Sequence, residues 1–129
     1  MINVMHIDSR KAHAIYENLD RASADDRRFF DLSRKVGLPF MKGEALTAIV
    51  RELVELGGYT AVAEVATDSL DVAYRDTNHI DRNWRENESV TALSREVRST
   101  SVGDLFIQDG VVHVVASFGF ERIDGLTDN

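Results

Sequence analysis

The feature that most constrains this chain is a two-residue Asp109-Gly110 turn between two apolar runs near the C-terminal end. Asp-Gly supplies the positive φ angles that a type I′ turn needs, and the twist of that turn matches antiparallel strands. A two-residue turn also fixes the register, with Gln108 opposite Val111. Because paired residues share one side of a sheet, the register predicts a wholly apolar face. This face consists of Leu105, Ile107, Val112 and Val114.

The opposite face of this hairpin is also fairly apolar, since it carries Phe106, His113 and Val115. A hairpin that is apolar on both sides is either enclosed within the fold or covered by another subunit. The adjacent pair Phe29-Phe30 adds further apolar surface that few elements are left to cover. This surplus predicts a homo-oligomer, most simply a symmetric dimer.

The composition indicates a single domain spanning residues 1–129. Hydrophobic residues make up 43% of the chain and there is one proline, which is typical of a compact globular protein. Cysteine is absent, which excludes disulfides, thiolate metal sites and cysteine nucleophiles. The net charge of −7 argues against a protein that binds nucleic acid through its phosphates. No segment has the pattern of a signal peptide or a membrane span, so we expect a cytoplasmic protein.

Helical periodicity dominates the first 58 residues. We expect one helix after Ser9 as its N-cap and a second helix starting near Asp25, where negative charge suits the helix dipole. The third helix has the clearest amphipathic pattern and ends at Gly57-Gly58. Residues 1–7 are either a strand or a disordered start. The apolar stripe of the third helix consists of Leu46, Ile49, Val50, Leu53 and Val54.

Strand-like patterns follow Gly57-Gly58. We expect strands over residues 59–66 and 70–75, joined as a second hairpin, and a short strand over 90–93. Residues 77–88 lack periodicity and predict an ordered loop anchored by Trp84. The chain after Ile123 is expected to fray. The predicted fold is therefore α+β, in which a helical layer (1–58) packs on an antiparallel sheet built from two or more hairpins within a β-rich layer (59–126).

The C-terminal segment, over about residues 74–123, resembles the YodL-like domain of phage, plasmid and conjugative-element proteins. The resemblance rests on Arg98–Asp104 (RSTSVGD), on the apolar strand that follows, and on Ser117–Glu121 (SFGFE). The family usually shows a similar hydroxyl-rich opening and an S-x-G-F close around a hairpin. The residues before this segment, from Tyr74 to Asn87, look like the form found in small phage proteins. The resemblance implies a mobile-element origin and assigns no catalytic residues.

Two interpretations of the segment Arg98–Asp104 remain open. It could bind an anion or a nucleotide, with hydroxyls and the Gly103 amide as donors and a guanidinium as counter-charge. It could instead be a strand-entry turn in which the hydroxyls satisfy backbone groups. The absence of P-loop spacing favours the structural interpretation. The candidate ligand-binding residues here are Arg98, Ser99, Ser101 and Asp104.

The adjoining loop contributes His79, Asp81, Trp84 and Glu86 as further candidate ligand-binding residues. Imidazole and carboxylate groups suit a divalent metal or proton transfer. The four histidines of the chain lack the spacing of metal ligands, however, so a salt-bridged loop around Trp84 is the favoured interpretation. We therefore predict no metal, no cofactor and no catalytic residue.

Three functions are compatible with these patterns. We expect a small non-enzymatic accessory protein of a phage or mobile element that binds a host protein. The alternative is a binder of a small anionic, nucleotide-type ligand that counters host defence. The third is a hydrolase-like enzyme with an unrecognised site. The sequence contains neither a G-x-S-x-G nucleophile elbow nor a glycine-rich dinucleotide fingerprint, which disfavours the enzyme.

Overall fold

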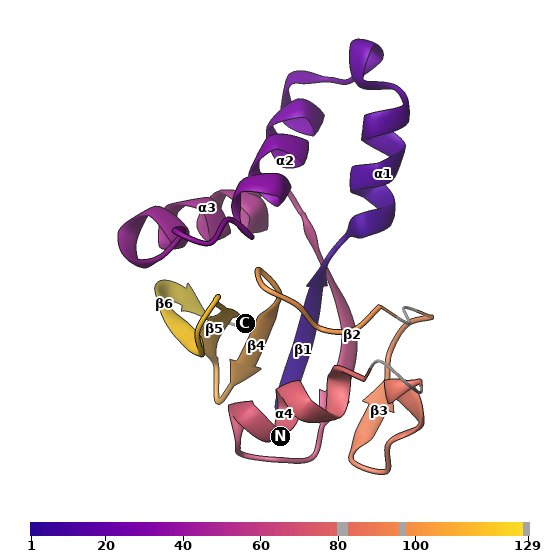
Figure 1. Ribbon diagram of the computed structural model, residues 1–129, viewed down its shortest axis with the longest axis vertical. Coiled ribbons are helices and arrows are strands. Elements are labelled where there is room, and N and C mark those ends of the chain that lie inside the picture. The colour runs from indigo at the N-terminus through magenta and orange to yellow at the C-terminus, as the bar shows by residue number, and fades with distance from the viewer. Residues whose placement is uncertain (80–82, 96–97, 128–129) are drawn as a thin grey trace.

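The structure is a computed structural model that describes residues 1–79, 83–95 and 98–127. Four helices and a six-stranded antiparallel sheet confirm the predicted α+β class (Figure 1). The strands are β1 (Ile2–Ile7), β2 (Tyr59–Val65), β3 (Val90–Ala92), β4 (Leu105–Gln108), β5 (Val111–Val115) and β6 (Phe120–Thr127). The helices are α1 (Ser9–Glu17), α2 (Ala24–Lys35), α3 (Gly43–Glu55) and α4 (Leu70–Thr77), with 3-10 turns η1 (Leu19–Arg21) and η2 (Trp84–Glu86).

The first residues of the chain form the central part of the sheet. The strand order is β3-β2-β1-β4-β5-β6, so β1 pairs with β2 on one side and with β4 on the other. Alternate residues of β1, namely Ile2, Val4 and His6, are fully buried. Residues 1–7 are therefore a strand, and this strand brings the N-terminal and C-terminal parts of the chain together.

The predicted hairpin between β4 and β5 is confirmed in both its turn and its register. Asp109 and Gly110 adopt φ angles of 51° and 77°, as a type I′ turn requires. Gln108 lies opposite Val111, and the pairing continues to the start of β4. The predicted apolar face is buried against the helices. Local turn chemistry thus determines how this part of the sheet is aligned.

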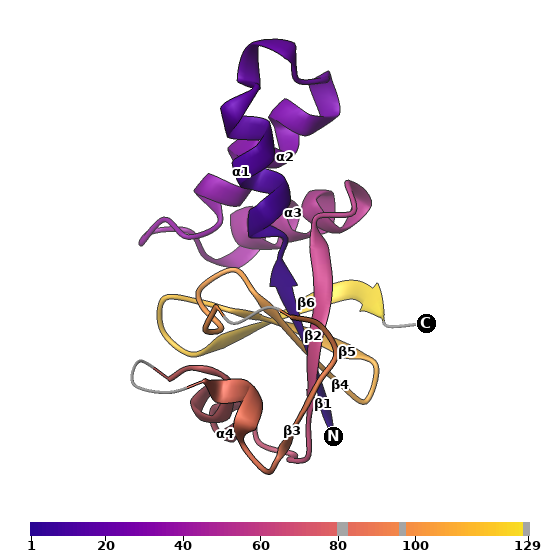
Figure 2. The same cartoon turned by 90° about the vertical axis from the view of Figure 1, so that its right-hand side faces the viewer.

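Helices α1 to α3 lie on one side of the sheet and α4 lies on the other (Figure 2). Each of the first three helices turns its apolar stripe toward the strands, as the helical periodicity predicts. The apolar side chains between these helices and the sheet form one cluster, which we call the helix-side core. Its buried members are Ile15, Phe29, Leu32, Val36, Leu46, Val50, Leu53, Leu105, Ile107, Val112, Val114, Ala116 and Ile123.

The predicted strand over residues 70–75, and with it the 59–75 hairpin, is wrong because these residues form α4. The Ser69 hydroxyl caps the helix by accepting a hydrogen bond from the Val72 amide at 3.2 Å. Helical spacing places the buried residues Ala73 and Thr77 on one face. A short amphipathic segment can fit both the two-residue period of a strand and the 3.6-residue period of a helix. Here the N-cap and the packing favour the helix.

The second face of the hairpin is covered within the chain itself. Phe106 is 0% exposed and packs, together with Val115 and Trp84, in a cluster that we call the α4-side core. Phe29 is buried on the other side of the sheet. Of the apolar surplus that motivated the predicted homo-oligomer, only Phe30 stays partly exposed, and the oligomeric state stays a prediction. The buried members of the α4-side core are Ile2, Val4, Val62, Ala63, Val65, Ala73, Trp84, Val90, Phe106 and Val115.

Two boundaries differ from the sequence-based expectation. Helix α1 is capped by Asp8 rather than by Ser9, since the Asp8 carboxylate accepts a hydrogen bond from the Lys11 amide at 3.0 Å. The chain after Ile123 continues as β6 to residue 127 rather than fraying there. The expected strand at 90–93 is present as β3, and it pairs with β2 at the edge of the sheet.

We predict that Gly110→Val lowers the free energy of unfolding by about 1–2 kcal/mol, because a β-branched residue at positive φ is strained. No heavy atom lies within 4 Å of a Cβ added at Gly110, so the cost comes from the backbone conformation rather than from a clash. Gly37→Val is the matched control, since a Cβ there also meets open space and Gly37 has no positive φ. Urea unfolding with equal stability for both variants would contradict the turn assignment.

We also predict that Phe106→Ala costs about 3–5 kcal/mol, because it removes a fully buried ring from the α4-side core. Phe118→Ala serves as control, since Phe118 is 95% exposed and its removal should change stability by no more than about 0.5 kcal/mol. Both values are measured by denaturant unfolding. A Phe106→Ala protein as stable as the control would mean that this face of the hairpin is not covered by the chain itself.

Candidate functional site

The polar centre of the molecule is a bidentate ion pair between Arg98 and Asp104. The Arg98 guanidinium donates from Nη1 to Asp104 Oδ2 at 2.8 Å and from Nη2 to Asp104 Oδ1 at 3.0 Å. The Asp104 side chain is 1% exposed and the Arg98 side chain is 29% exposed. A buried carboxylate needs such a partner, because an unpaired buried charge is strongly unfavourable.

The same ion pair joins residues 98–104 to the end of β1. Asp104 also accepts hydrogen bonds from the backbone amides of Ile7 at 2.9 Å and Ser101 at 2.8 Å. Arg98 in turn donates to the Ile7 carbonyl at 3.1 Å, to the Ser99 carbonyl and to the Ser101 hydroxyl. Arg98, Ser101 and Asp104, three of the candidate ligand-binding residues, therefore hold the backbone of their own segment against β1.

A chain of buried hydroxyl groups continues from β1 to α4. Thr77 Oγ1 donates to the Ala73 carbonyl at 2.7 Å, and Thr100 Oγ1 donates to Thr77 Oγ1 at 2.8 Å. His6 Nε2 lies 2.9 Å from Thr100 Oγ1. Because both hydroxyl protons are already used in this chain, His6 must donate, which places a proton on Nε2. His6 Nε2 also lies 3.8 Å from Asp104 Oδ2, so the hydroxyl chain adjoins the ion pair.

The remaining candidates connect the segment 98–104 to the loop after α4. Ser99 donates through its hydroxyl to the His79 carbonyl at 3.1 Å. Trp84 is 1% exposed and donates from Nε1 to the Arg98 carbonyl at 3.0 Å. The expectation that Trp84 anchors this loop is thereby confirmed. Because the Trp84 indole binds the backbone of Arg98, the candidates in the segment 98–104 and those in the loop after α4 form one connected network.

His79 takes part in the network through its ring as well. The Asn87 amide nitrogen Nδ2 lies 2.8 Å from His79 Nε2, and because an amide NH₂ can only donate, this ring nitrogen accepts. Asn87 also donates to the Asp76 carbonyl at 2.7 Å. Burial disfavours the charged form of Asp76, but hydrogen bonds from Ser89 and Arg75 outweigh it, so the pKa of the Asp76 carboxyl is lowered. An imidazole held by hydrogen bonding to Asn87 fits a structural role for His79.

Two candidates do not join the network. The Glu86 carboxylate is exposed on η2 and makes no hydrogen bond or ion pair with any residue in the described part of the chain. Asp81 lies outside the described residues. Among the residues that the structure describes, no three histidine, aspartate or glutamate side chains come together as metal ligands.

Gly103 and Tyr59 connect the segment 98–104 to β2. The Tyr59 hydroxyl donates to the Gly103 carbonyl at 2.8 Å. Burial raises the pKa of the Tyr59 hydroxyl, and the nearby negative charge of Asp104 raises it further. Gly103 has a φ of +96°, and a Cβ there would come within 2.7 Å of Val36. The glycine is therefore required by backbone conformation and by the close approach of α2.

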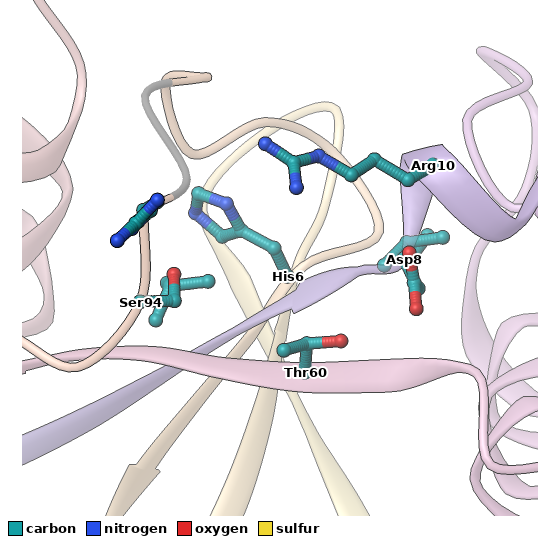
Figure 3. Close-up of a pocket in the computed structure, with 8 residues that line it drawn as sticks. His6, Asp8, Arg10, Thr60 and Ser94 are labelled. Atoms are coloured by element: carbon teal, nitrogen blue, oxygen red, sulfur yellow. The ribbon is translucent and has the colours of Figure 1, made fainter.

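A pocket of about 220 Å³ opens beside this network, where β1 leads into α1. Its lining includes His6 from β1, Thr60 from β2, Arg10 from α1, and Ser94 and Arg95 from the segment after β3. Figure 3 shows the Arg10 side chain extending from α1 toward the His6 ring, while the Asp8 carboxylate points away from that ring. None of these pocket residues was a candidate in the sequence, because arginines scattered along the chain form no motif.

Comparisons with known proteins do not extend this description. No family model matches the chain, and neither a curated protein nor a solved structure matches it significantly. Within the described ranges, no helix combines the length and apolar character needed to cross a membrane.

We predict that Arg98→Ala lowers the free energy of unfolding by about 3 kcal/mol, because it leaves the buried Asp104 carboxylate without its counter-charge. Arg10→Ala is the matched control: Arg10 is exposed, and its loss should change stability by no more than about 0.5 kcal/mol. Chemical denaturation measures both values. Equal stability of the two variants would show that the Arg98–Asp104 ion pair does not stabilise the fold.

Proposed function

We propose that this protein is a non-enzymatic accessory protein of a phage or mobile element that acts in the host cytoplasm by binding a host protein. The observation that carries the proposal is an exposed aromatic patch on the pair of helices α1 and α2. Tyr16 of α1 and Phe30 of α2 stack with ring centroids 5.9 Å apart, and Tyr16 is 64% exposed. Leu19, which is 38% exposed, follows α1. We call Tyr16, Leu19 and Phe30 the arm patch.

The position of the arm patch suits recognition of a partner. Figure 1 shows α1 and α2 as a pair that projects from the end of the sheet. Ile15 and Phe29, the neighbours of the patch residues in sequence, are buried in the helix-side core and fix the two helices. Tyr16 is exposed beside them, and Phe30 is partly buried against the same core, so little ordering of the two rings is needed on binding.

The charges around the arm patch indicate what kind of partner would fit. The Arg34 guanidinium lies 5.7 Å from the centroid of the Phe30 ring, and Arg27 lines a shallow groove with Leu19, Asp20 and Phe30. Tyrosine, other aromatic residues and arginine are the side chains most enriched where protein interfaces gain their energy. The partner would present an apolar pocket for the rings, with acidic groups at its border. The excess of acidic residues over basic residues in the chain does not favour nucleic acid as that partner.

Binding of a small anionic ligand is the second candidate function. The observation that favours it is the pocket lined by Arg10, Arg95 and His6, and not the turn at Arg98, where the guanidinium is held by the fold. The two candidates use separate parts of the surface and can be tested separately.

The wild-type protein should retain a partner protein from a bacterial lysate. We predict that Tyr16→Ser weakens the affinity for this partner by at least about thirtyfold, the effect of removing a binding hot spot. Phe118→Ser is the matched control, because it removes an even more exposed aromatic ring from the turn between β5 and β6. Quantitative mass spectrometry of the captured proteins compares the three samples. A thermal unfolding transition is measured on each variant to check that the fold is intact.

Retention of the same proteins, in the same amounts, by Tyr16→Ser and by the wild type would contradict a role for the arm patch. Loss of the protein from both variants would indicate general apolar adhesion rather than recognition. Native mass spectrometry of the purified chain alone gives the oligomeric mass, which distinguishes a host protein from a second copy of this chain as the partner.

A further inference from the structure

The pocket beside His6 concentrates positive charge on a protein whose net charge is −7. Arg10 approaches it from the first turn of α1 and Arg95 from the segment after β3. Within the described part of the chain, neither guanidinium makes an ion pair or a hydrogen bond. Two cations that line one pocket without an ion pair of their own produce a local positive potential, which attracts anions.

The acidic residue of the pocket, Asp8, offsets part of this positive charge but forms no ion pair with either guanidinium in the described part of the chain. The Asp8 carboxylate accepts the hydrogen bond from the Lys11 amide as the N-cap of α1, and it points away from His6. The nine-residue helix α1 therefore starts at the pocket, and the Asp8 carboxylate compensates the partial positive charge of its N-terminal end. The two guanidinium groups outweigh the single carboxylate, so the pocket keeps a net positive charge.

The other walls of the pocket combine hydroxyl groups with the apolar side chains of Ile7 and Val62. The hydroxyl groups of Thr60 and Ser94 lie on the opposite side from Arg10 (Figure 3). His6 is 0% exposed and is held by the hydrogen bond to Thr100, so the floor belongs to the rigid network around Asp104. A ligand would meet a preformed floor and two long side chains that can adjust to it, an arrangement found in many small-molecule sites.

From this geometry we propose that the pocket binds the phosphoryl group of a small phosphate monoester. Two guanidinium groups match the two negative charges of a phosphate monoester and the fork geometry of its oxygens, and the Thr60 hydroxyl can donate to the remaining oxygen. The volume of about 220 Å³ is below the range of sites that enclose a whole drug-sized ligand. The phosphoryl group would therefore enter the pocket, while the rest of the ligand extends outward.

The experiment titrates the full-length protein with inorganic phosphate and with a nucleoside monophosphate at low ionic strength, using isothermal titration calorimetry. We expect saturable binding of at least one probe. Arg10→Gln and Arg95→Gln should each weaken it by about tenfold or more, since each removes a charge-assisted interaction. Arg122→Gln is the matched control, because it removes an exposed arginine from β6, outside the pocket, and should leave the affinity unchanged.

Heteronuclear NMR locates the site independently of the variants. We expect ligand-induced shifts at the amides of Ser9 to Lys11, Thr60 and Ser94, with little change along β6. Tighter binding of the nucleotide than of phosphate assigns a phosphorylated small molecule as the ligand, and equal affinity assigns free phosphate; both agree with a phosphoryl site. No saturable binding up to about 10 mM, or binding that survives the Arg10→Gln/Arg95→Gln double variant, would overturn the proposal. Because Tyr16→Ser leaves this pocket intact, failure here and failure of the arm patch are distinguishable.

Discussion

The Arg98–Asp104 ion pair is the interaction on which the arrangement of this molecule depends. Asp104 precedes β4 and binds the amide of Ile7 at the end of β1, while Arg98 binds the carbonyl of the same residue. Segments that are 91 to 97 residues apart in the chain are thus fixed to one another by four polar atoms. The burial of Asp104 makes the pair obligatory, because desolvation of a carboxylate without a counter-charge would cost more than the fold can offset.

The hydroxyl-rich segment 98–104 therefore stabilises the fold, and the proposed binding surfaces lie outside this segment. The ion pair fixes the end of β1, and the next residues cap and start α1. That helix carries Arg10 toward the pocket on one side and Tyr16 onto the arm patch on the other. Both proposed binding surfaces therefore depend on one junction, although neither includes Arg98 or Asp104.

The sequence predicted the elements whose structure is decided locally. The Asp109-Gly110 turn specified its strands and their register, because turn conformation depends on two residues. Helix α4 was missed, since a segment of eight residues fits both a strand pattern and a helix pattern until a cap and a neighbouring core distinguish them. The segment 98–104 was recognised as polar and ordered, but its partner His6 is 94 residues away and could not be inferred from spacing. The pocket arginines carry no motif at all, because only the fold brings Arg10 and Arg95 to one place.

The most direct test of this account is native-state hydrogen exchange of the Ile7 and Ser101 amides, which donate to Asp104. If the ion pair is the centre of a rigid scaffold, both amides should exchange only through global unfolding, with the same free energy as amides in the middle of β4. In Arg98→Ala their protection should fall together with the stability of the whole domain. Exchange of these two amides as fast as that of the exposed turn residue Gly119 would contradict the account, because it would show that the segment opens independently of the sheet.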